Sequence, residues 1–308
     1  MNSGSSYFDF HTHIFPEIPF GIGEKIHPLR RTLRKLSFLN PLAADYYLQA
    51  QEWIPRKWQD RIETLDILPI AYQALIEGTY RDYIEIASQY KIAGSLVVAQ
   101  PPFAENNFVL DLCKEDQTLH PCLQFDIEKH TQPIRLEEFH KKGVRCLKFH
   151  GASSGIRPDD PRVLSLVEQA NDLEWVVVVH TGVLQIPGIF KDPTAGSVLL
   201  YKDWLKRHPN LKVVFAHSNI KDYKEIKDLT EISQSFYVTT SWQTESSILW
   251  LKENLGAERI LFASDWPTVG YNQHYATRKL ENLLRSDELM PIEFDQISRG
   301  NAHNLLAN

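Results

Sequence analysis

Two histidines separated by one residue, His11 and His13, are the first side chains in this sequence that could do chemistry. They directly follow the apolar segment 7–10, and residues i and i+2 of an extended chain point to the same side. Both imidazoles would therefore converge at one strand end, where they could bind a metal ion. The pair alone also fits two surface histidines, so its meaning depends on the other polar residues at strand ends.

Three further polar residues each close an apolar run, and they are His180 after 176–179, His217 after 213–216 and Asp265 after 260–264. A single such histidine is explained equally well by a hydrogen bond to a backbone carbonyl. Asp265 could instead cap the following helix. However, a carboxylate at the end of a buried strand is costly unless it is paired or metal-bound. The recurrence of the pattern favours a shared metal site.

The elements that must position these residues are short apolar strands alternating with helices. The expected strands are 7–10, 94–99, 122–125, 146–149, 175–179, 212–216, 236–240 and 260–263. The expected helices are 106–116, 134–142, 161–173, 197–207, 221–234, 244–255 and 275–285. Continuous apolar runs suit strands buried on both faces, and the alternation indicates a parallel sheet built from βαβ units.

The spacing of the strand ends selects the architecture. After the first interval, successive ends lie 23 to 37 residues apart, and a βα unit of an eightfold barrel needs about 30 residues. The sequence therefore predicts an α/β fold of the (β/α)₈ TIM barrel type. A doubly wound open sheet is the alternative, but eight strands with polar residues at their ends favour the barrel.

The first interval, from His11 to Ala99, is 88 residues and too long for one unit. We expect a single domain over 1–308 with an insertion at about 14–68, rich in aromatic residues and proline. Because the active-site loops of a barrel follow the strand ends, part of the insertion should wall the pocket. Another part could form the subunit contact of a homodimer.

The amino-acid composition narrows the classes of molecule that this protein could bind. The net charge of −6 argues against nucleic acid or a membrane as partner, since both reward a positive face. The three cysteines are scattered, which indicates reduced thiols. No apolar run of 18 residues and no signal-peptide pattern occurs. We expect a soluble cytoplasmic protein whose partner is a small-molecule substrate.

The combined motifs resemble those of the amidohydrolase superfamily. They are similar to the amidohydrolase-related (amidohydrolase 2) group that includes the aminocarboxymuconate semialdehyde and resorcylate decarboxylases. The motifs are YFDFHTH at 7–13, VVHTG at 178–182, VFAH at 214–217, LFASDWP at 261–267 and GNAHNLL at 300–306. The resemblance extends from Tyr7 to Leu306 apart from the insertion, and it identifies a superfamily rather than a substrate.

The resemblance implies one divalent ion and a division of roles. His11, His13, His180 and Asp265 would bind the ion, for which Zn²⁺ is favoured and Mn²⁺ is the alternative. An open position would hold a water with its pKa lowered toward about 7. Asp265 could accept a proton from that water, and His217 would be the catalytic histidine that polarises a carbonyl or donates a proton. No second cofactor is implied.

Lys148 and His150 follow the fourth strand and should face the mouth of the barrel. We favour a substrate-binding role for both, with Lys148 contacting a substrate carboxylate. Some branches of the superfamily carry a carboxylated lysine there that bridges two metals, which is one alternative. A lysine that runs past the rim to solvent is the other.

The leading functional prediction is a metal-dependent hydrolase that attacks a small ester, lactone or amide with a metal-activated water. The alternative is a metal-dependent non-oxidative decarboxylase of a small unsaturated or aromatic carboxylic acid, because the same ligands serve both reactions. Hydrolysis of a phosphate ester fits less well, since such barrels carry more histidine and acidic ligands. A barrel that only binds a partner is disfavoured by the intact ligand set.

Overall fold

The computed structural model describes residues 6–17, 55, 58, 78–129, 133–184, 190–267 and 272–307, with the backbone alone over 272–275. Eight parallel strands lie in one sheet in the order of the sequence. They are β1 (Tyr7–Thr12), β2 (Ile92–Val98), β3 (Leu119–Gln124), β4 (Cys146–Phe149), β5 (Val176–His180), β6 (Lys212–Ala216), β7 (Phe236–Thr239) and β8 (Ile260–Leu261).

Hydrogen bonds between the first and last strands close the sheet. The Phe10 N–H donates to the carbonyl of Phe262 at 2.9 Å, and the Asp265 N–H donates to the carbonyl of His11 at 2.8 Å. Thr12 also pairs with Trp266 in a parallel bridge. The chain is thus a TIM barrel, which confirms the fold predicted from the strand spacing.

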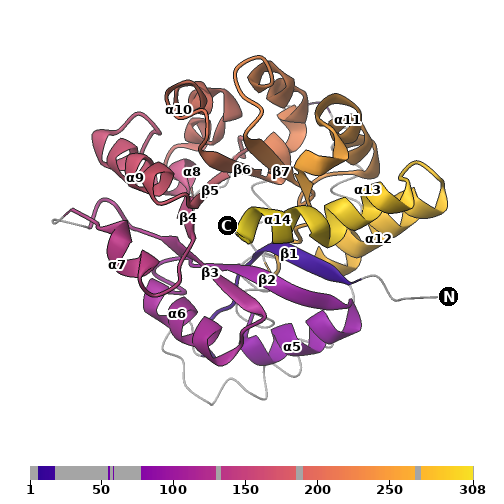
Figure 1. The fold of residues 1–308 in the computed structure, drawn as a ribbon, viewed down its shortest axis with the longest axis horizontal. Helices are drawn as coiled ribbons and strands as arrows, with labels where there is room; N and C mark the ends of the chain where they lie inside the picture. Colours follow the sequence, from indigo (N-terminus) through magenta and orange to yellow (C-terminus); the bar gives the residue numbers. More distant parts are fainter. Residues whose placement is uncertain are drawn as a thin grey trace.

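Helices surround the ring of strands (Figure 1). The α-helices are α5 (Tyr80–Gln89), α6 (Asn106–Glu115), α7 (Leu136–His140), α8 (Gly151–Ser154), α9 (Pro161–Asp172), α10 (Lys202–Arg207), α11 (Glu245–Leu255), α12 (Asn272–Arg285), α13 (Pro291–Asp295) and α14 (Asn301–Leu306). The 3₁₀ segments are η3 (Pro193–Gly196), η4 (Val198–Tyr201), η5 (His217–Leu229) and η6 (Ala257–Arg259), and η7 (Gln296–Gly300) is π-helical.

The apolar strands separate two clusters of buried side chains. In β5, Val176 and Val178 belong to the inner cluster, whereas Val177 and Val179 pack outward against the helices. All four are at most 1% exposed. Burial on both faces explains why the strands are apolar without alternation.

Helix α14 closes the end of the barrel at which the strands begin. Its residues Ala302 and Leu305 join the inner cluster, and the ring of His303 lies 5.4 Å from that of Phe8 at the start of β1. Figure 1 shows this helix across the centre of the ring. The opposite end, where the strands finish, is left for the polar side chains.

Two predicted helices are wrong in detail. The segment 221–234, expected as an α-helix, belongs partly to the 3₁₀ segment η5, which opens with left-handed backbone at Ser218 and Asn219. The Asn219 side chain accepts from the Val198 N–H at 3.1 Å and donates to the Asp222 carbonyl at 2.9 Å. Such bonds compete with helical ones. The expected helix 197–207 is divided into η4 and α10.

The insertion at about 14–68 lies outside the described residues except for 14–17, 55 and 58, so its position over the pocket stays a prediction. Phe15, at its start, is buried and pairs with Thr79 before α5. All three cysteines are free and buried, as expected. Among the helices of the described ranges, none is long and apolar enough to cross a membrane.

Candidate metal centre

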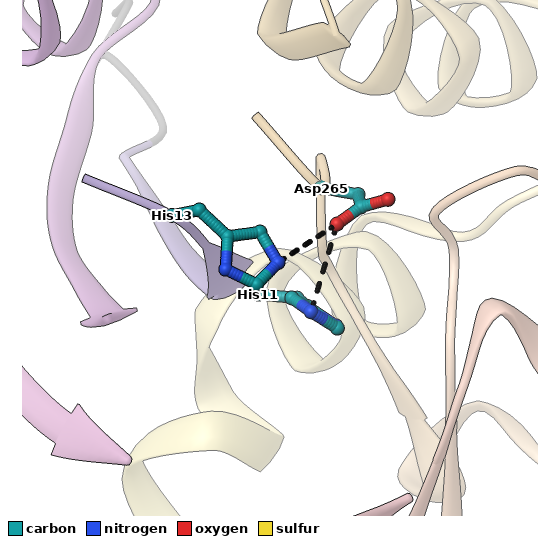
Figure 2. Close-up of side chains that lie close together, drawn as sticks. All are labelled: His11, His13 and Asp265. Carbon is teal, nitrogen blue, oxygen red and sulfur yellow. Dashed lines mark ion pairs between the residues drawn. The ribbon is translucent and has the colours of Figure 1, made fainter. Parts of the chain in front are cut away.

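Three of the predicted ligands meet where β1 and β8 end. His11 lies in β1, His13 follows that strand, and Asp265 comes four residues after β8. Figure 2 shows both imidazoles directed at the carboxylate. Oδ1 of Asp265 lies 3.6 Å from Nε2 of His11 and 3.4 Å from Nε2 of His13. Tetrahedral bonds near 2.1 Å to one zinc ion would hold two ligand atoms about 3.4 Å apart.

The hydrogen bonding of these residues fits a cation between them. Nδ1 of His13 lies 2.9 Å from the carbonyl oxygen of Val98, which can only accept, so Nδ1 carries the hydrogen. In the neutral ring, Nε2 then directs a lone pair at Oδ1 of Asp265, and two such lone pairs repel without a cation. Both ring nitrogens of His11 are buried without a hydrogen-bond partner among the described residues. Unpaired buried nitrogens of this kind require an explanation, and a bound metal ion supplies one.

His180, the fourth predicted ligand, is not part of this three-residue cluster. Its ring lies 4.9 Å from that of His217, and its Nε2 is buried with no hydrogen-bond partner in the described part of the chain. The ring of His150 stacks on it at 3.9 Å and 9°, and Phe190 meets it edge-on at 5.4 Å. His180 thus lies beside the cluster, and its Nε2 makes no hydrogen bond to the described residues.

The backbone and a tryptophan hold Asp265 in place. Its φ of 59° is left-handed, and its Oδ2 accepts a hydrogen bond from the indole N–H of Trp242 at 2.6 Å. Burial would raise the pKa of the carboxyl, but the imidazoles of His217 and His11 hold that pKa well below its ordinary value. Asp265 is therefore a carboxylate at neutral pH.

His217 faces the same carboxylate from the end of β6. Its Nδ1 lies 4.0 Å from Oδ2 of Asp265 and 3.0 Å from Oγ of Ser241. Its backbone N–H donates to Oγ of Thr239 at 2.8 Å, and Gln243 donates to its carbonyl at 2.7 Å. Burial lowers the pKa of the imidazole to about 3, so the ring is neutral at neutral pH.

Lys148 is buried in β4, with 3% of its surface exposed and its Nζ lacking a hydrogen-bond partner within the described ranges. Burial lowers its pKa to about 8, against an opposing effect of Asp265. His150 begins helix α8, where its Nδ1 accepts from the N–H of Ser153 at 3.3 Å. Its Nε2 therefore carries the hydrogen when the ring is neutral. That Lys148 and His150 bind substrate stays a prediction.

Several contributing residues escape the pattern analysis. Ser241 and Trp242 follow β7, and a search of every strand end would have included them. Asp9 precedes His11 by two residues and is fully buried, where it contacts Ser264. A carboxylate inside an apolar strand is costly, which was the available signal.

Comparison with models of protein families shows to which family this chain belongs. The family model described as amidohydrolase matches residues 8–307. The chain belongs to the amidohydrolase family. This confirms the resemblance drawn from the motifs, and it places the chain among enzymes that share a barrel while differing in reaction. A search of curated proteins finds no match.

Solved structures share the fold of this amidohydrolase at low identity. An uncharacterized TIM-barrel protein from Bordetella bronchiseptica has a TM-score of 0.67 and 17% identity over 98% of both chains. A dihydroxybenzoic acid decarboxylase from Polaromonas sp. JS666, with bound manganese and the inhibitor 2-nitroresorcinol, has a TM-score of 0.63 and 15% identity over 98% of this chain and 97% of its own. A Pseudomonas putida protein, provisionally assigned as a 2-pyrone-4,6-dicarboxylic acid hydrolase, has a TM-score of 0.62 and 17% identity over 98% of both chains.

Proposed function

We propose that the protein is a metal-dependent hydrolase of a small ester, lactone or amide that also carries a carboxylate. The observation that carries this proposal is the orientation of Asp265. One of its oxygens faces His11 and His13, and the other lies 4.0 Å from Nδ1 of His217. A carboxylate oxygen and an imidazole thus adjoin the position that the ligands define, and attack by water requires one proton acceptor there.

We propose that His11, His13 and Asp265 hold one divalent ion, with His180 as a fourth ligand. Nitrogen and oxygen ligands suit Zn²⁺, and the manganese of the Polaromonas decarboxylase supports Mn²⁺ as the alternative. When bound, such an ion would polarise a carbonyl oxygen and lower the pKa of a water molecule.

The side chains around the ligands would divide the proton transfers and substrate contacts. Asp265 can take the proton of the attacking water, and the neutral imidazole of His217, held by Ser241, can polarise the substrate carbonyl or donate a proton to the leaving group. Lys148 is an ammonium below about pH 8 and can bind a substrate carboxylate. The Nε2–H of His150 can donate a second hydrogen bond.

The test is turnover of carboxylated lactones, esters and amides by the metal-loaded protein in ¹⁸O-labelled water. Hydrolysis places one oxygen of water in the carboxyl group of the acid product, which mass spectrometry detects. If the protein holds its metal and turns over none of these classes, the hydrolase proposal is wrong.

A second candidate is non-oxidative decarboxylation of a planar unsaturated or aromatic acid. It is favoured by a small apolar cluster in which Phe190 and Trp242 pack with Leu184 and Ile220. These rings adjoin His180 and Asp265, so a planar group could lie against them. In this reaction the carboxyl group leaves as CO₂ and a proton takes its place. Deuterium on the product carbon in D₂O, with release of CO₂, would identify it.

A further inference from the structure

Asp9 is a buried residue of β1 whose side chain contacts the residues that follow β8. It is 0% exposed. Its Oδ1 accepts from the N–H of His11 at 3.2 Å and from the N–H of Ser264 at 2.9 Å. Its Oδ2 accepts from the hydroxyl of Ser264 at 2.5 Å. Each donor belongs to a ligand or to the residue next to one.

The hydroxyl of Ser264 extends this contact along the segment that follows β8. Having donated to Asp9, its Oγ accepts from the N–H of Trp266 at 3.0 Å. The two residues that flank Asp265 are therefore bonded to each other, and both are bonded to β1, Ser264 through Asp9 and Trp266 through Thr12. The backbone bond from Asp265 N–H to the carbonyl of His11 completes the connection.

This connection matters because Asp265 has left-handed backbone, with φ at 59°. Such a conformation is unfavourable for a residue other than glycine and persists where its surroundings fix it. A buried side chain held by three hydrogen bonds supplies that rigidity. The 3.6 Å separation between Oδ1 of Asp265 and Nε2 of His11 depends on how these two strand ends are held.

We propose that Asp9 is a positioning residue that acts through Ser264 to hold His11 and Asp265 at the separation a divalent ion requires. This inference rests on the proposed metal site. Asp9 itself touches neither the ion nor the substrate. Its effect would therefore be seen first in metal affinity, and in turnover as a consequence.

The test is the affinity of the full-length protein for Zn²⁺ and Mn²⁺, measured by competition with a chelator. In Asp9→Ala, the side chain that accepts all three hydrogen bonds is removed. We expect affinity to fall 10- to 100-fold, the usual effect of removing a group that orients a ligand. Ser264→Ala should weaken binding in the same direction, and Ser264→Thr, which keeps the hydroxyl, should restore it.

Asn301→Ala is the matched control. Asn301 donates two buried hydrogen bonds near the start of β8, to the carbonyls of Ala257 in η6 and of Ile260 in β8. Its loss should lower thermal stability and leave metal affinity unchanged. Wild-type affinity in folded Asp9→Ala overturns the inference, and if that variant does not fold, wild-type affinity in Ser264→Ala does so. His11→Ala separates the two proposals, because undiminished binding there means that the metal site itself is wrong.

Discussion

Burial sets the protonation of the two side chains that would act on the substrate. The imidazole of His217 and the amine of Lys148 are each 3% exposed, and for both the cost of burying a charge lowers the pKa. The resulting charge states differ because the ordinary pKa of a lysine lies well above that of a histidine. His217 becomes neutral throughout the physiological range, whereas Lys148 keeps its charge up to about pH 8.

His217→Ala should retain the metal and lose activity. The imidazole touches Asp265 only at 4.0 Å and lies outside the three-residue ligand cluster. Loss of a positioned acid or base costs about 10²–10⁴ in rate. Metal analysis and turnover of the same sample check this prediction. A variant purified without its metal would make His217 a ligand instead.

Lys148→Met should stabilise the metal-free protein at neutral pH. The folded-state pKa of about 8 lies below the unfolded value, so the unfolded chain binds more protons between them and wild-type stability rises with pH in that window. The shift corresponds to a penalty on the order of 3 kcal/mol below pH 8. Urea unfolding of both proteins should give a difference that narrows from pH 8 to 10.4. A difference independent of pH would contradict the prediction.

Lys148→Met also tests the proposed contact between Lys148 and a substrate carboxylate. Because the ammonium would bind a carboxylate, Lys148→Met should raise KM for acidic substrates more than for their neutral methyl esters. Equal effects on both would show that Lys148 makes no charge-dependent contact.

At the scale of elements, two glycines let the loop after β5 approach η3 closely, two residues beyond His180. The Gly182 N–H donates to the carbonyl of Gly196 at 2.8 Å. A side chain at position 196 would overlap the carbonyl oxygen of Gly182. The loop and η3 must therefore separate if Gly196 is replaced.

Gly196→Ala should cost about 1–3 kcal/mol of stability, as overpacking usually does, and should lower turnover because His180 is displaced. Gly143→Ala is the control. Its φ of +89° makes that substitution strained, but no atom lies within 4 Å of the added carbon. It should lose stability with turnover unchanged, as thermal melts and rate measurements on both variants will show.

At the scale of the whole molecule, closure of the barrel brings the ligands together and metal binding should stabilise the closed form. We expect one divalent ion per chain in protein purified without chelator. Free metal at 100 times its Kd should stabilise the fold by about 2.7 kcal/mol, so chelation should lower Tm and added metal should restore it. A ratio near two, with a carboxylated Lys148, would contradict the mononuclear site.

The sequence by itself determined the barrel and the identity of the candidate ligands. Continuous valines at 176–179 report burial on both faces, and a polar residue directly after such a run can only lie at the strand's carboxyl end. The strand spacing then selects eight βα units, the strand-end positions mark a shared polar site, and the resemblance to the amidohydrolases divides that site into ligands and a catalytic histidine. These signals are local, so a single sequence carries them.

Tertiary structure alone decided how the ligand atoms meet. Trp242 reaches Oδ2 of Asp265 from a different strand end, and Asp9 reaches Ser264 across 255 positions of the sequence. The left-handed φ of Asp265 likewise depends on the bonds that close the barrel. No local pattern specifies such contacts, because they arise when β8 is hydrogen-bonded beside β1.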